Sequence, residues 1–199
     1  MIYNQNINKA VKVLKQGGIV IFPTDTAFGI GCRIDSEKSV KRLFEIRKRP
    51  SSQAVPVLVD SISMAGKYWL SPLPDNVRHL MKDNWPGGLT VIYKCRTDII
   101  GPLVRGAGLT LGVRMPDHDE IREIIRQVGV PVLGPSANFH SDMTPYEIKD
   151  LNPDLVKLVD LVLDGTCTVK LSSTVIDCSV SPWRILRQGK TVVDINKYD

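Results

Sequence analysis

The stretch "IVIFPTDTAFGIGCRI", Ile19 to Ile34, contains the pattern on which the predicted fold rests. Residues 19–22 are a short apolar run, typical of a buried strand, and a proline closes it. A polar loop follows with Thr24, Asp25 and Thr26, and residues 28–34 resemble a second strand. Glycines inside a strand indicate that another group approaches the backbone closely. The stretch therefore predicts two strands joined by a loop of polar side chains at a strand end.

The same alternation of helix and strand periods continues along the chain. Apolar spacing predicts helices around residues 7–14, from Asp35 or Ser36 to about Arg49, around 77–81, and from a capping box of Asp117 and Glu120 to about Val128. Strands are predicted at 19–22, 28–34, 55–59, 89–95, 109–115, 130–134, 161–164, 173–177 and 184–187. This order predicts an α/β fold with a mixed sheet, in one domain over residues 1–199.

The composition is that of an ordinary globular protein and gives no sign of a membrane or secreted protein. Of 199 residues, 43% are hydrophobic and 24% are charged, as in ordinary globular proteins. No apolar run is long enough to span a membrane, and the N-terminal residues lack the layout of a secretory signal. The four cysteines are widely spaced, and the three histidines share no ligand-like spacing. We therefore expect a cytoplasmic protein with reduced thiols and no protein-bound metal.

A basic cluster lies between Lys41 and Arg49, where five basic residues accompany one acid. Cations near a helix C-terminus are favourable against the helix dipole, so a solvated helix face is one interpretation. The other is a polyphosphate site, because arginine offers two-pronged hydrogen bonding to phosphate. No GxxxxGK[ST] loop is present, so side chains would have to neutralise the phosphates.

The segment "LGPSANF", residues 133–139, also leaves alternatives open. It resembles the G-x-S-x-G nucleophile elbow, but Asn138 replaces the second glycine, and the last histidine is only four residues beyond Ser136. A turn stabilised by side-chain hydrogen bonds is a second interpretation. A set of hydroxyl and amide groups that holds a phosphate or carboxylate is the third.

Further hydroxyl and arginine side chains stand at other predicted strand ends, in residues 171–177 and 184–189. Ligands of open α/β sheets bind in the loops beyond strand ends. In each segment alone, the polar side chains could have a purely structural role. Their occurrence together at several strand ends favours a common binding site.

Seven segments in this order resemble the YrdC/TsaC family of threonylcarbamoyl-AMP synthases. They are Pro23-Thr24-Asp25-Thr26, Arg47-Lys48-Arg49-Pro50, Trp85-Pro86-Gly87-Gly88, Val113-Arg114-Met115-Pro116, Pro135-Ser136-Ala137-Asn138, Ser173-Thr174-Val175-Ile176-Asp177 and Ile185-Leu186-Arg187. The resemblance covers about residues 7–189 and is to the short, single-domain form. Arg47, Gln53, Leu58 and Phe28 differ from the usual family residues lysine, asparagine, histidine and tyrosine.

The resemblance implies a YrdC-like, twisted, open mixed sheet flanked by helices, with a large basic cavity. It implies a nucleotidyltransferase that makes threonylcarbamoyl-AMP and pyrophosphate from L-threonine, bicarbonate and ATP, with Mg²⁺ accompanying ATP. The product would pass to a tRNA threonylcarbamoyl-transferase complex for the threonylcarbamoyladenosine modification of tRNA. The alternative is a non-catalytic module that binds RNA directly or associates with the ribosome.

The resemblance also implies the site residues. ATP binding falls to Arg47, Arg49, Gln53, Thr110, Ser136, Asn138, Thr144 and Arg187. Threonine binding falls to Thr26, Arg114 and Ser173, with Arg114 as the carboxylate clamp. Thr110 and Arg114 are four residues apart in a predicted strand, so their side chains share a face. An ordinary ion pair of Arg114 with Asp117 or Glu120 is the alternative. No covalent nucleophile is implied.

Overall fold

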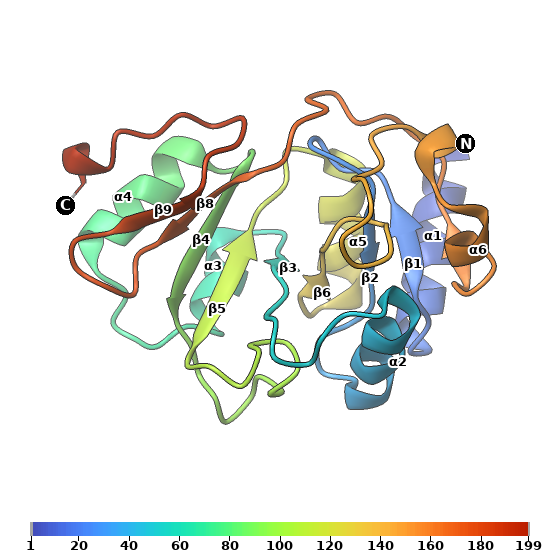
Figure 1. The fold of residues 1–199 in the computed structure, drawn as a ribbon, viewed down its shortest axis with the longest axis horizontal. Coiled ribbons are helices and arrows are strands. Elements are labelled where there is room, and N and C mark those ends of the chain that lie inside the picture. Colours follow the sequence, from blue (N-terminus) through green and yellow to red (C-terminus); the bar gives the residue numbers. More distant parts are fainter. Residues whose placement is uncertain (1, 199) are drawn as a thin grey trace.

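The computed structural model shows two mixed sheets with helices packed against them (Figure 1). It describes residues 2–198, so Met1 and Asp199 of the predicted 1–199 domain lie outside the described residues. The predicted α/β class with a mixed sheet is confirmed, although the strands form two sheets instead of one. Within residues 2–198, no helix is both long and apolar enough to cross a membrane.

The helices and strands follow the order of the prediction. The α-helices are α1 (Ile2–Lys15), α2 (Glu37–Arg47), α3 (Ile62–Gly66), α4 (Asp75–Asn84), α5 (Asp119–Val128) and α6 (Pro153–Val156). The strands are β1 (Val20–Phe22), β2 (Gly29–Gly31), β3 (Val57–Leu58), β4 (Leu89–Lys94), β5 (Thr110–Arg114), β6 (Val132–Leu133), β7 (Leu161–Val162), β8 (Thr174–Asp177) and β9 (Arg184–Arg187). Two 3₁₀ turns are η1 (Ile148–Asp150) and η2 (Ile195–Lys197).

Every predicted strand segment contains one of these strands, and the four predicted helices correspond to α1, α2, α4 and α5. The short helices α3 and α6 were not predicted. The predicted capping box of α5 is wrong: the helix is capped by His118, whose side chain accepts a hydrogen bond from the Ile121 N–H. For α2, Asp35 and Ser36 were the two predicted caps, and Ser36 is the residue that caps the helix.

The strands pair into two separate sheets. The smaller sheet has the order β2-β1-β7, and the larger has the order β6-β3-β5-β4-β8-β9. In Figure 1, α1 lies behind β1, and α4 lies behind the β4, β8 and β9 part of the larger sheet. The larger sheet mixes parallel pairs such as β3 with β5 and antiparallel pairs such as β4 with β5.

A backbone seam joins the sheets between residues 28–34 and 131–137. The N–H of Ile30 donates to the carbonyl of Pro135 at 2.9 Å, and the N–H of Leu133 donates to the carbonyl of Cys32 at 2.9 Å. Gly31 lies at the closest approach, because a Cβ there would stand 2.2 Å from the carbonyl oxygen of Leu133. The glycines of residues 28–34 therefore do mark a close backbone approach.

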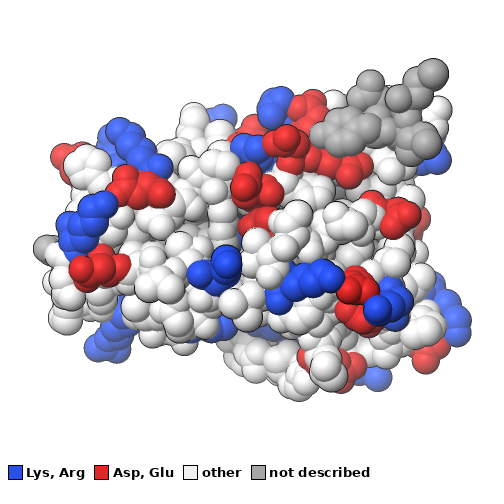
Figure 2. All heavy atoms as spheres, turned by 90° about the horizontal axis from the view of Figure 1, so that it is seen from above, with Lys and Arg blue, Asp and Glu red and all other residues white. Residues whose placement is uncertain are grey.

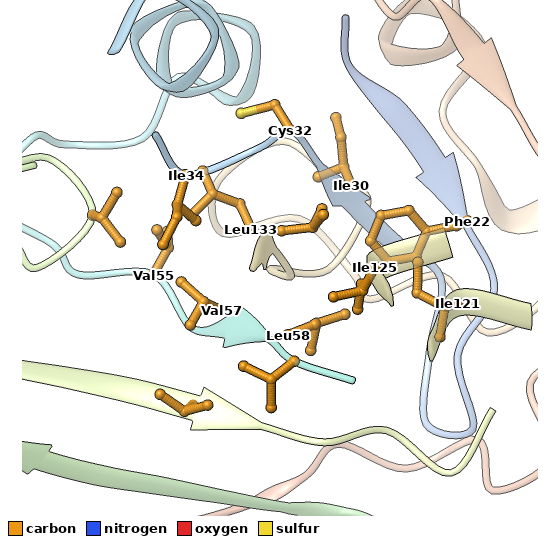
Figure 3. Packing of buried hydrophobic residues seen from close by; sticks show 14 of the residues in the cluster. Phe22, Ile30, Cys32, Ile34, Val55, Val57, Leu58, Ile121, Ile125 and Leu133 are labelled. Carbon is orange, nitrogen blue, oxygen red and sulfur yellow. The ribbon is translucent and has the colours of Figure 1, made fainter. Parts of the chain in front are cut away.

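One hydrophobic core continues across this seam (Figure 3). Phe22 and Ile30 of the smaller sheet meet Leu58 and Leu133 of the larger sheet, and Ile125 of α5 packs among them. Because apolar side chains from both sheets share this core, the two sheets are held in a fixed relation.

We expect Gly31→Ala to lower the free energy of unfolding by about 1–3 kcal/mol or more, because the new methyl group would overlap backbone that cannot move aside easily. The change is measured by denaturant unfolding. Gly66→Ala is the matched control: a Cβ at this helical position meets nothing within 4 Å, so it should be neutral or stabilising. Equal stability of the two variants would contradict the importance of the seam.

Candidate functional site

A polar cavity of about 190 Å³ lies where the two sheets meet. Segments far apart in the sequence line it: the β1–β2 loop, the end of α2, β3, β4, the end of β5, the residues after β6, and the residues around β8 and β9. Its charged lining residues are Arg47, Arg49, Arg114 and Arg187, and no aspartate or glutamate is among the described lining residues. The cavity therefore has an excess of positive charge and suits an anion.

The end of helix α2 brings two arginines to the cavity. Arg47 is in the last turn, and Lys48 then adopts a left-handed conformation with φ 52°. This cap turns the chain so that Arg49 also faces the cavity, whereas Lys48 points to the ring of Phe139, with its ammonium 5.0 Å from the ring centre. The Arg-x-Arg spacing therefore follows from the helix end.

Both arginines are anchored through backbone carbonyls instead of carboxylates. Arg47 is 2% exposed and donates from Nε to the carbonyl of Asn138 at 3.0 Å. Arg49 donates to the carbonyls of Gln53 and Ala54 at 3.2 and 2.6 Å. Burial, with the nearby charge of Arg49, lowers the pKa of Arg47 to about 10. The buried Nη1 of Arg47 has no hydrogen-bond partner within residues 2–198, so one donor group of this guanidinium is unsatisfied in the fold.

The other basic residues of the cluster have different environments. Arg42 forms an ion pair with Asp160 at 2.6 Å, and Lys41 is exposed. The interpretation as a solvated helix face therefore holds for this half of the cluster.

The segment after β6 supports the Arg47 guanidinium. Ser136 donates its hydroxyl proton to Oδ1 of Asn138 at 2.6 Å, and Nη2 of Arg47 donates to the same oxygen at 3.2 Å. The amide nitrogen of Asn138 donates to the carbonyl of Asp142 at 2.6 Å. Since the Ser136 proton goes to an amide and not to a base, this geometry does not match an activated serine nucleophile.

Arg114, at the end of β5, has a partner at each guanidinium nitrogen. It donates to the carbonyl of Gly87 at 3.0 Å, to the hydroxyl of Thr26 at 2.6 Å, and to the carboxylate of Asp25. Burial lowers the pKa of Arg114, and the Asp25 carboxylate acts in the opposite direction. The expected alternative, an ion pair with Asp117 or Glu120, is wrong because Asp25 is the partner.

Arg187 of β9 is held by Ser173, the residue before β8. It donates to the Ser173 carbonyl and to the Ser173 hydroxyl, both at 2.9 Å. Burial lowers the pKa of Arg187, and its charge in turn contributes to the lowered pKa of Arg114.

The four arginines therefore form two groups in one cavity. The first group is Arg47 and Arg49, and the second is Arg114 and Arg187. Within each group the nearby charge of one arginine lowers the pKa of its partner. Cations brought together in this way are favourable when an anion lies between them.

Most of the predicted site residues line the cavity, namely Thr26, Arg47, Arg49, Arg114, Ser136, Thr144, Ser173 and Arg187. Asn138 lies directly behind this wall, bonded to Arg47 and Ser136. Gln53 is exposed, and Thr110 begins β5, about 13 Å along the strand from Arg114. Neither Gln53 nor Thr110 lines the cavity. Thr110 shares a face of β5 with Arg114 but lies at the other end of the strand.

Three buried polar lining or supporting residues were not predicted as site residues: Thr24, Asp25 and Thr90. Thr90 is a polar residue within the apolar run of β4, which is the signal that could have identified it. Within residues 2–198, no cluster of three or more His, Cys, Asp or Glu residues is placed to hold a metal ion.

Comparison with known proteins identifies the relatives of this arrangement. The sequence pattern of the family Sua5_yciO_yrdC, described as "Telomere recombination", matches residues 12–189. The chain belongs to the Sua5/YciO/YrdC family.

Individual members of the family show how similar the chain is. It is 33% identical over 184 residues to the threonylcarbamoyl-AMP synthase of Bacillus subtilis, covering 92% of this chain and 53% of that protein. The structure of Pyrococcus abyssi Sua5 complexed with L-threonine is 29% identical, with a TM-score of 0.87, and the match covers 92% of this chain and 54% of that one. The chain therefore spans about half the length of these relatives.

Escherichia coli YciO, an uncharacterised protein, is similar over most of its length. It is 30% identical over 92% of this chain and 88% of its own sequence. Its crystal structure gives a TM-score of 0.83 at 27% identity, covering 96% of this chain and 92% of that one. The Sua5/YciO/YrdC fold of the described residues is thus matched by both long and short members.

The four positions at which the resemblance implied a departure from the YrdC/TsaC pattern mostly line the cavity. Phe28, Arg47 and Leu58 line it, whereas Gln53 does not. Arg47 keeps the positive charge of the usual lysine, and Leu58 adds an apolar surface to a largely polar lining.

We expect Asp25→Ala to lower the free energy of unfolding by about 3–5 kcal/mol, because Arg114 would keep a buried charge without its carboxylate. Denaturant unfolding measures the change. The double variant Asp25→Leu/Arg114→Met should recover part of the loss, since it removes both charges. Asp98→Ala breaks the exposed pair with Arg96 and should have no measurable effect. A cost for Asp25→Ala as small as that of Asp98→Ala would contradict the role given to the buried pair.

Proposed function

We propose that the chain is an L-threonylcarbamoyl-AMP synthase, a nucleotidyltransferase that joins L-threonine, bicarbonate and ATP and releases pyrophosphate. The observation that carries the proposal is the cavity with two arginine groups and no lining carboxylate. Two anionic substrates, a nucleotide triphosphate and an amino acid with its carboxylate, require two such groups. Relatives named threonylcarbamoyl-AMP synthase and a Sua5 structure with L-threonine support it.

The arginine group at the end of α2 would bind the phosphates of ATP. Arg47 and Arg49 supply guanidinium groups, and Ser136, Asn138 and Thr144 supply neutral hydrogen-bonding groups beside them. Because the guanidiniums are anchored by carbonyls, their charge is not cancelled before the nucleotide arrives. Gln53 and Thr110, predicted with this group, would contact only parts of the nucleotide that extend beyond the cavity.

The second arginine group would bind threonine. Arg114 is the proposed clamp for the carboxylate, with Thr26 and Ser173 as hydroxyl partners. Arg187, predicted for the phosphates, is bonded to Ser173 and so stands beside this group. It would neutralise charge at the place where the two substrates meet.

The chemistry follows from these charges. The threonine amine combines with bicarbonate to give a carbamate and water. A carbamate oxygen then attacks the α-phosphorus of ATP, the bond to the β-phosphate oxygen breaks, and pyrophosphate leaves with its Mg²⁺. Such a transfer depends on positioning and on charge neutralisation more than on a covalent nucleophile. Four arginines and several hydroxyls supply these requirements.

The product would be passed to a tRNA threonylcarbamoyl-transferase complex in the cytoplasm. Direct RNA binding is a weaker proposal, because aromatic residues are only 6% of the sequence and no basic stretch interleaved with aromatic residues occurs in it. Figure 2 shows basic and acidic groups interspersed on the face it displays.

The reaction itself is the first test. Purified protein should release pyrophosphate from ATP only when threonine and bicarbonate are both present, and threonylcarbamoyl-AMP should appear by mass spectrometry. Threonine, and serine more weakly, should support release, whereas valine and 2-aminobutyrate should not, because hydroxyl partners in the pocket would be left unpaired. Release that is equal with valine would contradict the threonine pocket. RNA binding without any pyrophosphate release would instead favour the non-catalytic alternative.

Two variants separate the arginine groups. Arg49→Ala should weaken ATP binding about ten- to a hundredfold, because a charge-assisted contact to phosphate is lost. Arg114→Lys should raise the KM for threonine far more than the KM for ATP, since an ammonium cannot reproduce the two-pronged contact. Steady-state kinetics and ATP titration measure both effects. An Arg114→Lys effect confined to ATP would show that the groups have been assigned to the wrong substrates.

A further inference from the structure

Thr90 lies in β4 at the point where the parts of the second arginine group meet. It is 4% exposed and lines the cavity. Thr90 and Arg114 are direct partners across β4 and β5, so their side chains are neighbours on one face of the sheet. The Thr90 hydroxyl is also 2.9 Å from the hydroxyl of Ser173, which holds Arg187. Thr90 therefore stands between the two arginines of the group.

The hydroxyl protons of this pair can be counted. A hydroxyl has one proton and two lone pairs, and arginine can only donate. One lone pair of Ser173 is therefore taken by Arg187. In the bond between Thr90 and Ser173, one hydroxyl donates its proton and the other keeps its own. Within residues 2–198 nothing accepts the remaining proton, so the pair offers one proton to the cavity.

The opposite side of Arg114 has a similar arrangement. The Thr24 hydroxyl donates to the carbonyl of Ala27 at 2.7 Å, so its proton is used. The Thr26 hydroxyl accepts from Arg114 at 2.6 Å and lies 3.2 Å from the Thr24 oxygen. Its own proton is therefore left for that long contact or for a ligand. On both sides of Arg114, a hydroxyl group can thus donate a proton to a ligand. A ligand group that lies between these hydroxyls must therefore be a hydrogen-bond acceptor.

We propose that Thr90 is a positioning residue, which through Ser173 directs a hydroxyl proton to a substrate oxyanion held between Arg114 and Arg187. The oxyanion is the carboxylate of the amino-acid substrate, so the inference rests on the proposed function. Without the Thr90 hydroxyl, Ser173 would be held only by Arg187, and its proton would lose its fixed direction.

The test is Thr90→Val, which keeps the branched shape and removes the hydroxyl. L-Threonine and ATP are each titrated calorimetrically into wild type, Thr90→Val and Thr90→Ser, which needs no turnover, and the KM of each substrate is then measured. Thr90→Val should weaken threonine binding about three- to tenfold, as expected for one neutral hydrogen bond, and should leave ATP binding within about twofold. Thr90→Ser restores a hydroxyl and should rescue threonine binding.

A double variant tests whether Thr90 acts through Ser173. Adding Thr90→Val to Ser173→Ala should weaken threonine binding no further, because the proton that Thr90 directs is already gone. Thr174→Val is the control for stability: it removes a buried threonine hydroxyl that donates to the carbonyl of Thr191 and does not line the cavity. It should lower the melting temperature without a selective effect on threonine.

Several outcomes would overturn the inference. They are threonine binding by Thr90→Val equal to wild type, no rescue by Thr90→Ser, additive losses in the double variant, or a selective loss of ATP binding. The last of these would identify the oxyanion as phosphate. Failure of the proposed function is seen separately: wild type would bind threonine yet release no pyrophosphate with threonine and bicarbonate.

Discussion

Two sheets share one core in this protein because the backbone at Gly31 lies against the backbone at Leu133. A side chain at Gly31 would hold the segments apart, and the hydrogen bonds between residues 28–34 and 131–137 would lengthen or break. The seam also determines where the cavity is. The β1–β2 loop precedes one side of the seam and Ser136 lies near the end of the other, so the loop of Thr24, Asp25 and Thr26 is brought opposite strands β4 and β5.

The cavity concentrates positive charge where water is partly excluded, which is costly for the folded protein. The chain limits this cost in two ways. Arg114 is neutralised by a buried carboxylate, Asp25, and is thereby held rigidly. Arg47, Arg49 and Arg187 are held mainly by carbonyl, amide and hydroxyl oxygens, which orient the guanidiniums without cancelling their charge. The net charge therefore remains for a substrate, and the affinity for an anion is gained at the expense of stability.

The cavity lies entirely in the part of the chain that is similar to both Sua5 and YciO. The described residues contain the whole cavity, so the groups that would bind both substrates belong to the part shared with long and short members. Of the four expected differences from the family pattern, Phe28, Arg47 and Leu58 line the cavity, and Phe28 also belongs to the seam, where its carbonyl accepts from the N–H of Ala137. Leu58 contributes both to the cavity wall and to the core that the two sheets share, because it lines the cavity and is 1% exposed.

The sequence alone determined the order and type of the elements. Apolar periodicity located the nine strands and the four longer helices of residues 2–198, because each element must bury one side. Of the eleven site residues that the resemblance implied, eight line the cavity. Periodicity did not reveal the division into two sheets, since strand pairing depends on contacts between segments a hundred residues apart. It did not identify Asp25 as the partner of Arg114, or Thr90 as the partner of Ser173. It put Thr110 on the same strand face as Arg114, yet Thr110 does not line the cavity. Spacing along a strand determines the face of a side chain, whereas only the tertiary structure decides what that face meets.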